Sequence, residues 1–122
     1  MDISLEIPHS AYFIRSYKPG EITINDTAYR QSMVLMASKL ISDWPPQSIE
    51  ALTAEHLLSL LTYQPEIILL GTGTKHSFPP IEWLIPIQQA GVGIEVMSTD
   101  AAARTFNVLV SEGRNVMAAL LL

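Results

Sequence analysis

The chain has no cysteine, few basic residues and no long hydrophobic run. The absence of cysteine excludes thiol catalysis, disulfide bonds and thiolate metal sites, and it fits a reducing compartment. The apolar runs are far shorter than the ~20 residues needed to span a bilayer. Residues 1–10 lack the basic and apolar regions of a secretory signal. We therefore expect a cytoplasmic globular protein that does not insert into a membrane.

Basic charge is scarce, because seven Lys and Arg residues stand against twelve Asp and Glu, for a formal net charge of −5. The basic residues are scattered along the chain and form no stripe of the kind that neutralises nucleic-acid phosphates. Nucleic acid is therefore not an expected partner. The histidines His9, His56 and His76 lack the clustered spacing of a zinc site, so the sequence predicts no metal centre and no cofactor.

A length of 122 residues is typical of one domain, and the 48% hydrophobic content is enough for a core that needs no metal or disulfide. We assign residues 1–122 to a single domain and expect 1–15 to be an irregular N-terminal segment. Residues 21–25 alternate apolar and polar side chains, as a half-buried strand does. The Asn-Asp-Thr sequence that follows favours a turn. Residues 29–36 are thus predicted to return as the second strand of a hairpin, and 39–44 are consistent with a third strand.

The rest of the chain alternates helical and extended patterns. We expect helices at 52–61, 79–91 and 99–114, and strands at 66–70, 92–97 and 116–122. Thr53 and Thr99 are the expected N-caps of the first and third helices, and Pro86 is expected to kink the second. The result is an α/β fold, a parallel β-α-β-α-β unit with an N-terminal antiparallel hairpin. Ligands of such sheets bind beyond the carboxyl ends of the strands.

A glycine-rich loop, GTGTKH at residues 71–76, follows the strand predicted at 66–70. Gly71 and Gly73 match the first two glycines of a dinucleotide fingerprint, but His76 stands where the third belongs and the next helix is delayed. Two interpretations stay open. The loop is either a tight turn that needs glycine for positive φ or a site for a small anion, held by backbone N–H groups and by Thr72, Thr74 and Lys75.

Further polar residues lie near the same strand ends. Glu95 is an acid within an apolar strand, and it is expected either to pair with Arg104 or Arg114, to lie at an exposed position, or, as a minority interpretation, to serve as a catalytic carboxylate. Arg104 and Asn107 share one helix face, which is either solvated or a binding surface. A ligand site at these strand ends would be lined by residues 71–76 and 98–100.

Three stretches together resemble a known family: LLGTGTKHSFPP (69–80), GVGIEVMSTDAAARTFNVLVSEGR (91–114) and the final VMAALLL. It is a small single-domain family of unknown function that includes the mitochondrial respiratory complex I assembly factor 3 and bacterial and archaeal stand-alone proteins. The resemblance implies a three-layer β/β/α fold and no established catalytic mechanism. It also implies a role like that of the mitochondrial members, which bind other proteins while a membrane complex is assembled.

Two functional hypotheses result. The first is a non-enzymatic protein-binding or assembly-factor-like module, whose partner is another protein. The alternative is a small enzyme or sensor that binds an anion or nucleotide at the carboxyl ends of the strands. No residue is assigned as catalytic, and the candidate residues for a ligand or partner site are Gly71, Thr72, Gly73, Lys75, His76, Glu95, Ser98, Thr99, Arg104 and Asn107.

Overall fold

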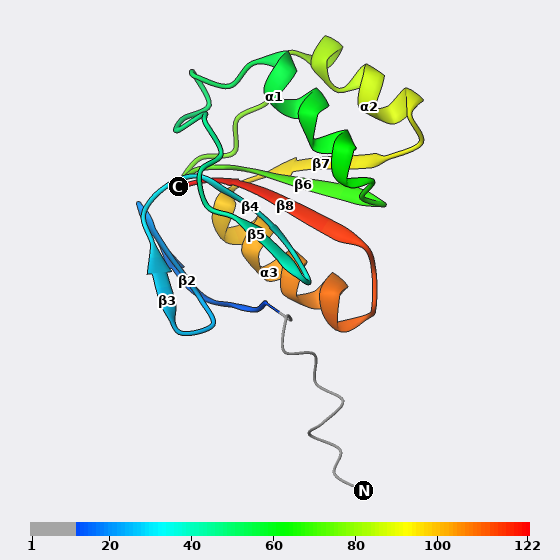
Figure 1. Ribbon diagram of the computed structural model, residues 1–122. Coiled ribbons are helices and arrows are strands. Elements are labelled where there is room, and N and C mark those ends of the chain that lie inside the picture. Colours follow the sequence, from blue (N-terminus) through cyan, green and yellow to red (C-terminus); the bar gives the residue numbers. More distant parts are fainter. Residues whose placement is uncertain (1–11) are drawn as a thin grey trace, which may run out of the picture.

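The computed structural model describes residues 12–122, which form a mixed α/β fold (Figure 1). The strands are β1 (Ile14–Lys18), β2 (Glu21–Ile24), β3 (Thr27–Tyr29), β4 (Met33–Met36), β5 (Lys39–Ile41), β6 (Ile67–Thr72), β7 (Gly93–Met97) and β8 (Val116–Leu121). The helices are α1 (Ala54–Leu58), α2 (Ile85–Gln89) and α3 (Thr99–Ser111), with short 3₁₀ helices η2 (Ser59–Tyr63) and η3 (Ile81–Trp83).

The strands form two sheets. A three-stranded antiparallel sheet has the order β1-β2-β3, and a five-stranded mixed sheet has the order β5-β4-β8-β6-β7. In the larger sheet β6 is parallel to β7 and to β8, whereas β4 is antiparallel to β8. The parallel β-α-β-α-β unit expected from the sequence is therefore confirmed as β6-α2-β7-α3-β8. Figure 1 shows α1 and α2 on one face of this sheet and α3 on the other.

Strand β8 lies at the centre of the molecule and contributes to two separate hydrophobic cores. Its residues Val116, Ala118 and Leu120 pack with α3 and the three-stranded sheet. The alternate residues of β8 pack with α1, α2 and Trp44 on the opposite face. All six residues of β8 are buried, which explains its unbroken apolar sequence, because a strand covered on both faces cannot alternate with polar residues.

The predicted N-terminal hairpin is present, but its second strand is shorter than expected. Asn25 has a φ of 53°, and the two-residue turn joins β2 to β3, with Ile24 opposite Thr27. Of the strand predicted at 29–36, Tyr29 belongs to β3 and Met33–Met36 form β4, which lies in the other sheet. Residues 30–32 between them include Ser32, a buried residue whose N–H donates a hydrogen bond to the Gln47 side chain. After this break the chain leaves the three-stranded sheet, and β4 pairs with β8 in the five-stranded sheet.

Strand β1 was not predicted, and its residues Ile14 and Arg15 belong to the segment expected to be irregular. Positions 1–11 of that segment, including His9, lie outside the described residues. β1 has a β-bulge between Ile14 and Ser16, where its register with β2 shifts. The bulge interrupts the period-2 alternation by which a strand is recognised in a sequence.

Two helices differ from their predictions for local chemical reasons. The helix predicted at 52–61 starts as expected, since Thr53 and His56 form a reciprocal capping box, but it tightens into η2 after Leu58. The helix predicted at 79–91 reduces to η3 and α2. Pro86 occupies the first turn of α2, where its missing N–H costs nothing, so the α-helix starts there and is not kinked within.

Replacing Gly71 by alanine tests how tightly α3 packs on β6. A Cβ atom at Gly71 would lie 2.9 Å from Thr99 Oγ1 and 3.0 Å from both Thr99 Cα and Leu120 Cδ2. We expect Gly71→Ala to lower the free energy of unfolding by roughly 1–3 kcal/mol, because backbone atoms must shift. Urea unfolding followed by tryptophan fluorescence measures the change.

Gly93→Ala is the matched control, because the atoms nearest to a Cβ there belong to the Ile67 side chain, at ordinary contact distances of 3.5–3.8 Å. Its free energy of unfolding is expected to stay within about 0.5 kcal/mol of the parent value. Equal losses in the two variants would contradict the close-packing argument.

Candidate functional site

The buried hydroxyl of Thr99 joins the three segments that meet at the carboxyl ends of the central strands. Its Oγ1 donates a hydrogen bond to the Leu121 carbonyl in β8 and accepts one, 2.8 Å long, from the N–H of Gly73. The backbone N–H of Thr99 also donates to the Gly73 carbonyl at 2.9 Å. Thr99 is fully buried. Its position therefore fixes the start of α3 against the glycine loop and β8.

Thr99 was expected to cap α3, and this prediction was wrong by one residue. Ser98 is the N-cap, and its side chain accepts a hydrogen bond from the N–H of Ala101. Ser98 can cap because its backbone is extended, with φ −64° and ψ 158°. Thr99 instead lies in the first turn of the helix, pointing into the protein.

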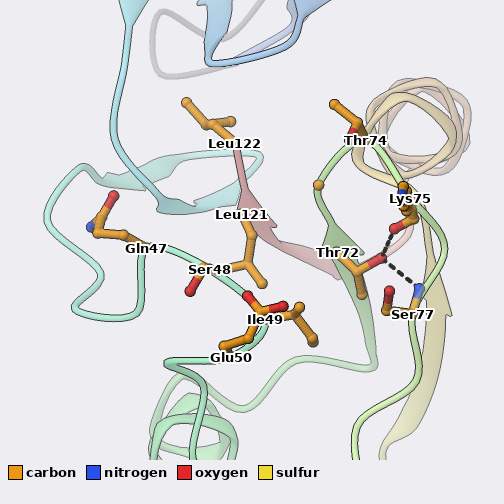
Figure 2. Close-up of a pocket in the computed structure, with 11 residues that line it drawn as sticks. Gln47, Ser48, Ile49, Glu50, Thr72, Thr74, Lys75, Ser77, Leu121 and Leu122 are labelled. Atoms are coloured by element: carbon orange, nitrogen blue, oxygen red, sulfur yellow. Dashed lines mark hydrogen bonds between the residues drawn. The ribbon is translucent and has the colours of Figure 1, made fainter.

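A second threonine, Thr72, organises the glycine loop from within (Figure 2). Its Oγ1 donates to the backbone carbonyls of Lys75 and Met97 and accepts a hydrogen bond, 3.1 Å long, from the N–H of Ser77. A hydroxyl has one hydrogen to donate, so the two carbonyls share it. The loop is thus closed on itself by a side chain that comes from the end of β6.

Both glycines of the loop have conformational reasons that involve no ligand. Gly71 leaves space for the backbone of Thr99. Gly73 has a φ of +97°, in the region that favours glycine. The N–H of Gly73, a group on which an anion site would draw, already donates to Thr99. These contacts support the tight-turn interpretation of GTGTKH.

An open pocket of about 270 Å³ lies at the carboxyl ends of β6 and β8. Residues 72–75, Ser77, the loop 47–50 and the last two residues of the chain line it. Figure 2 shows Ile49 and Glu50 facing Thr72 and Ser77 across the pocket. It is at the sheet edge where the sequence predicted a site.

The lining of this pocket differs from the expected one. Residues 72–75 of the expected lining belong to it, but Gly71, His76 and the 98–100 segment do not. The other wall, residues 47–50, was missed because nothing in its composition marks a site. Tertiary folding alone brings it opposite the glycine loop.

The remaining loop candidate, His76, is exposed, and its ring contacts a neighbouring aromatic ring in a tilted arrangement. Its ring centroid lies 4.5 Å from that of Phe78. Among residues 12–122, no group of three His, Asp or Glu side chains is arranged to hold a metal ion.

Glu95 lies at an exposed position of β7, one of the alternatives expected from the sequence. Its two expected partners pair elsewhere: Arg104 with Asp100 on α3, and Arg114 with Glu66. The pKa of Glu66 is lowered, first by the hydrogen bond from the Arg114 side chain and then by the backbone N–H of Asn115. Glu95 has no ion pair among the described residues.

Asn107 attaches strand β1 to helix α3. Its Oδ1 accepts a hydrogen bond of 3.0 Å from the N–H of Ile14, and its Nδ2 donates one of 2.8 Å to the carbonyl of the same residue. The amide side chain thus pairs with β1 as a neighbouring strand would. Arg104 and Asn107 also line a small pocket of about 250 Å³ with Tyr17, whose pKa is raised by burial and then by Asp100.

One surface feature was not recognised in the sequence. Phe78 and Ile81 are each 71% exposed and Ile85 is 42% exposed, and all three belong to the segment that leads from β6 into α2. We call these three side chains the apolar surface. The sequence predicted only a helix at 79–91 and did not say which of its apolar residues face outward. The short η3 and α2 turn several of them outward.

The fold and the contacts around the glycine loop define a mixed α/β protein. This is the fold class implied by the family resemblance of residues 69–80, 91–114 and 116–122. Residues 14–121 match a family model described as a protein of unknown function (DUF498/DUF598), and the chain belongs to this family. A solved structure of a Xanthomonas campestris protein aligns with a TM-score of 0.84 and 37% sequence identity, covering 99% of this chain and 92% of that one.

Two of the relatives with descriptive names represent two kinds of name found in the family. The chain is 33% identical over 117 residues to the "13 kDa major membrane protein" of Francisella tularensis subsp. holarctica, covering 95% of each chain. It is 31% identical over 118 residues to "NADH dehydrogenase [ubiquinone] 1 alpha subcomplex assembly factor 3" of Rattus norvegicus. The aligned part is 95% of this chain but only 63% of the rat protein.

The Francisella name bears on cellular location. Within residues 12–122 no helix has the length and apolar character required to cross a bilayer. The cytoplasmic location expected from the sequence stays a prediction.

Replacing Thr99 by valine tests the buried hydroxyl. Valine keeps the shape of the side chain but leaves the Gly73 N–H and the Leu121 carbonyl without their partner. We expect the free energy of unfolding to fall by roughly 2–4 kcal/mol, since each buried polar group left unpaired costs about 1–3 kcal/mol.

The control is Thr99→Ser, which keeps the hydroxyl and loses only a methyl group, at an expected cost of about 1 kcal/mol. Denaturant melts of both variants give the comparison. A serine variant as unstable as the valine variant would show that the methyl group, not the hydrogen bonds, is important.

Proposed function

We propose that the chain is a non-enzymatic protein-binding module that acts in the manner of an assembly factor. The observation that supports this most directly is the apolar surface. Large apolar side chains exposed singly are common, but two at 71% and a third at 42% within residues 78–85 form a concentration of the kind found at protein interfaces. Aromatic residues such as Phe78 are also enriched there.

The position of the apolar surface suits a docking role. It lies on the helical layer of α1 and α2, away from α3 and the three-stranded sheet (Figure 1). The short helices are held on the sheet by buried Leu84 and Ile87, so the outward residues start from a fixed base. A preformed surface of this kind binds without a large ordering cost.

The named relatives add support. Several members of the family are assembly factors by name, and the alignment with the rat protein includes 95% of this chain. A protein partner is the simplest common feature. The identity of that partner is not carried over from the relatives, because this chain spans 63% of the rat protein.

Affinity capture with surface variants tests the proposal. In extracts of the encoding organism, we expect the tagged parent chain to retain a stoichiometric protein partner that the double variant Phe78→Ser/Ile81→Ser loses by at least about tenfold, because truncated interface anchors typically cost 2 kcal/mol or more. Mass spectrometry quantifies the partner, and reconstitution from purified components confirms direct contact.

Val108→Ser is the matched control, because Val108 is 53% exposed but lies on α3. It is expected to retain the partner fully. The proposal fails if no stoichiometric partner is retained by the parent chain, or if all three chains retain it equally.

A second candidate function is the binding of a small anion or nucleotide in the pocket at the strand ends. The observation that favours it is the place of the pocket, beyond the carboxyl ends of β6 and β8, where α/β sheets commonly bind ligands. Lys75 supplies a cation, whereas Glu50 on the opposite wall opposes a multiply charged anion. A singly charged ligand therefore fits better than a nucleoside triphosphate.

A thermal-shift screen of nucleotides, phosphate and phosphorylated metabolites tests this second function. A ligand at 100 times its dissociation constant is expected to stabilise the parent chain by ~2.7 kcal/mol. Lys75→Ala should abolish that shift, while Lys39→Ala, outside the pocket, should leave it intact. If none of the compounds raises the melting temperature, this function is discarded.

A further inference from the structure

Charge is distributed unevenly between the two sides of the molecule. The helical layer, residues 49–63 and 78–92, contains three acids, Glu50, Glu55 and Glu82, and no Lys or Arg. Glu82 follows Ile81 directly in η3 and lies between Ile81 and Ile85 in the chain. Among the described residues, none of these three acids forms an ion pair. Glu82 therefore places next to Ile81 a negative charge that no ion pair within residues 12–122 neutralises.

The basic side chains lie mainly on the opposite side and are already paired. Arg15, Lys18 and Arg30, in or beside the three-stranded sheet, each form an ion pair. Arg104 on α3 and Arg114 after it are also paired. Lys75 lines the pocket at the strand ends, and Lys39 lies 5.8 Å from the centre of the Tyr63 ring. No basic residue belongs to η3 or α2.

We propose that the apolar surface binds a basic, amphipathic segment of another protein, with apolar side chains on Phe78, Ile81 and Ile85 and Lys or Arg residues opposite Glu82. This inference rests on the proposed function and specifies the chemistry of its partner. Complementary charge at the rim of an apolar contact speeds association and selects the partner. Glu82, the acid next to Ile81 in the chain, determines where a positive charge of the partner is expected.

The same charges argue against two other occupants. Anionic lipid headgroups would be repelled by the acids of the helical layer, whereas they attract basic surfaces. A second copy of this chain, docked through the same face, would bring Glu82 close to its own equivalent. A two-fold contact is self-complementary in shape but not in charge when one sign predominates.

Selection from a random 16-residue peptide library displayed on phage tests the inference, with the folded parent chain immobilised as bait. Phe78→Ser/Ile81→Ser serves as the bait for subtraction. We expect the peptides retained only by the parent chain to combine apolar positions at helical spacing with an excess of Lys and Arg. Retained peptides that are acidic or uncharged would overturn the inference.

Titration of the most enriched peptide by fluorescence anisotropy then locates its charge. Glu82→Lys is expected to weaken binding about three- to fivefold at low salt, as loss of an exposed ion pair does. Glu112→Lys makes the same charge change at an exposed position beyond α3 and should alter binding by less than about 1.5-fold, because distant charges are screened. Equal effects of the two variants would show that only net charge matters, against a specific contact.

Flotation with phosphatidylglycerol vesicles covers the lipid alternative. The parent chain is expected to stay unbound, and vesicle binding that depends on Phe78 and Ile81 would replace the protein segment by a membrane. Analytical ultracentrifugation tests for self-association, since dimerisation that Phe78→Ser/Ile81→Ser abolishes would overturn the inference.

The proposed function is judged separately: a captured partner that needs Phe78 and Ile81 but lacks a basic segment would uphold the function and refute only this inference.

Discussion

The hydroxyl group of Thr99 is the contact around which the carboxyl end of the sheet is built. It connects β8, the loop after β6 and the first turn of α3 through two hydrogen bonds made by one buried oxygen. Such a group is costly to bury alone, but it specifies a unique arrangement when every partner is in place. The position of Thr99 also explains why residue 71 is glycine, because only a residue without a side chain lets the Thr99 backbone approach β6 this closely.

This arrangement changes the significance of the glycine loop. Phosphate-binding loops leave their backbone N–H groups free to face a ligand. Here the N–H of Gly73 is used by Thr99, and that of Ser77 by Thr72. The polar groups of the loop serve mainly to hold three chain segments together. The functional surface is therefore sought on the helical layer, where large apolar side chains are exposed and the acids form no ion pair within residues 12–122.

Much of the fold could be predicted from local pattern. Strand β6 and helix α3 follow from an apolar run and a 3.6-residue period, and Gly91 and Gly113 mark helix ends with φ of 83° and 77°. The division of the return strand at Ser32 could not be predicted, because it depends on β4 pairing with β8. The same applies to Asn107, whose amide completes a strand that is distant in sequence.

The candidate site was harder to predict than the fold for a related reason. Side chains such as Thr72 and Lys75 were correctly placed at the strand ends, but residues 47–50 reach them only through tertiary folding. The apolar surface was missed because periodicity predicts which residues a long helix buries. It has no such power over η3 and α2, each too short to complete two turns.

The central place of β8 has a consequence for how the chain folds. Met33 pairs with Leu120, and Val34 with Ala119, so the sheet joins segments separated by more than eighty residues. Strand β8 lies between β4 and β6 in the sheet, and its residues contribute to both hydrophobic cores. Without β8, therefore, β4 and β6 are not connected and neither core is complete. Loop-closure entropy must be met before these distant pairs can form, which slows folding. Completion of both hydrophobic cores therefore depends on the pairing of this one strand.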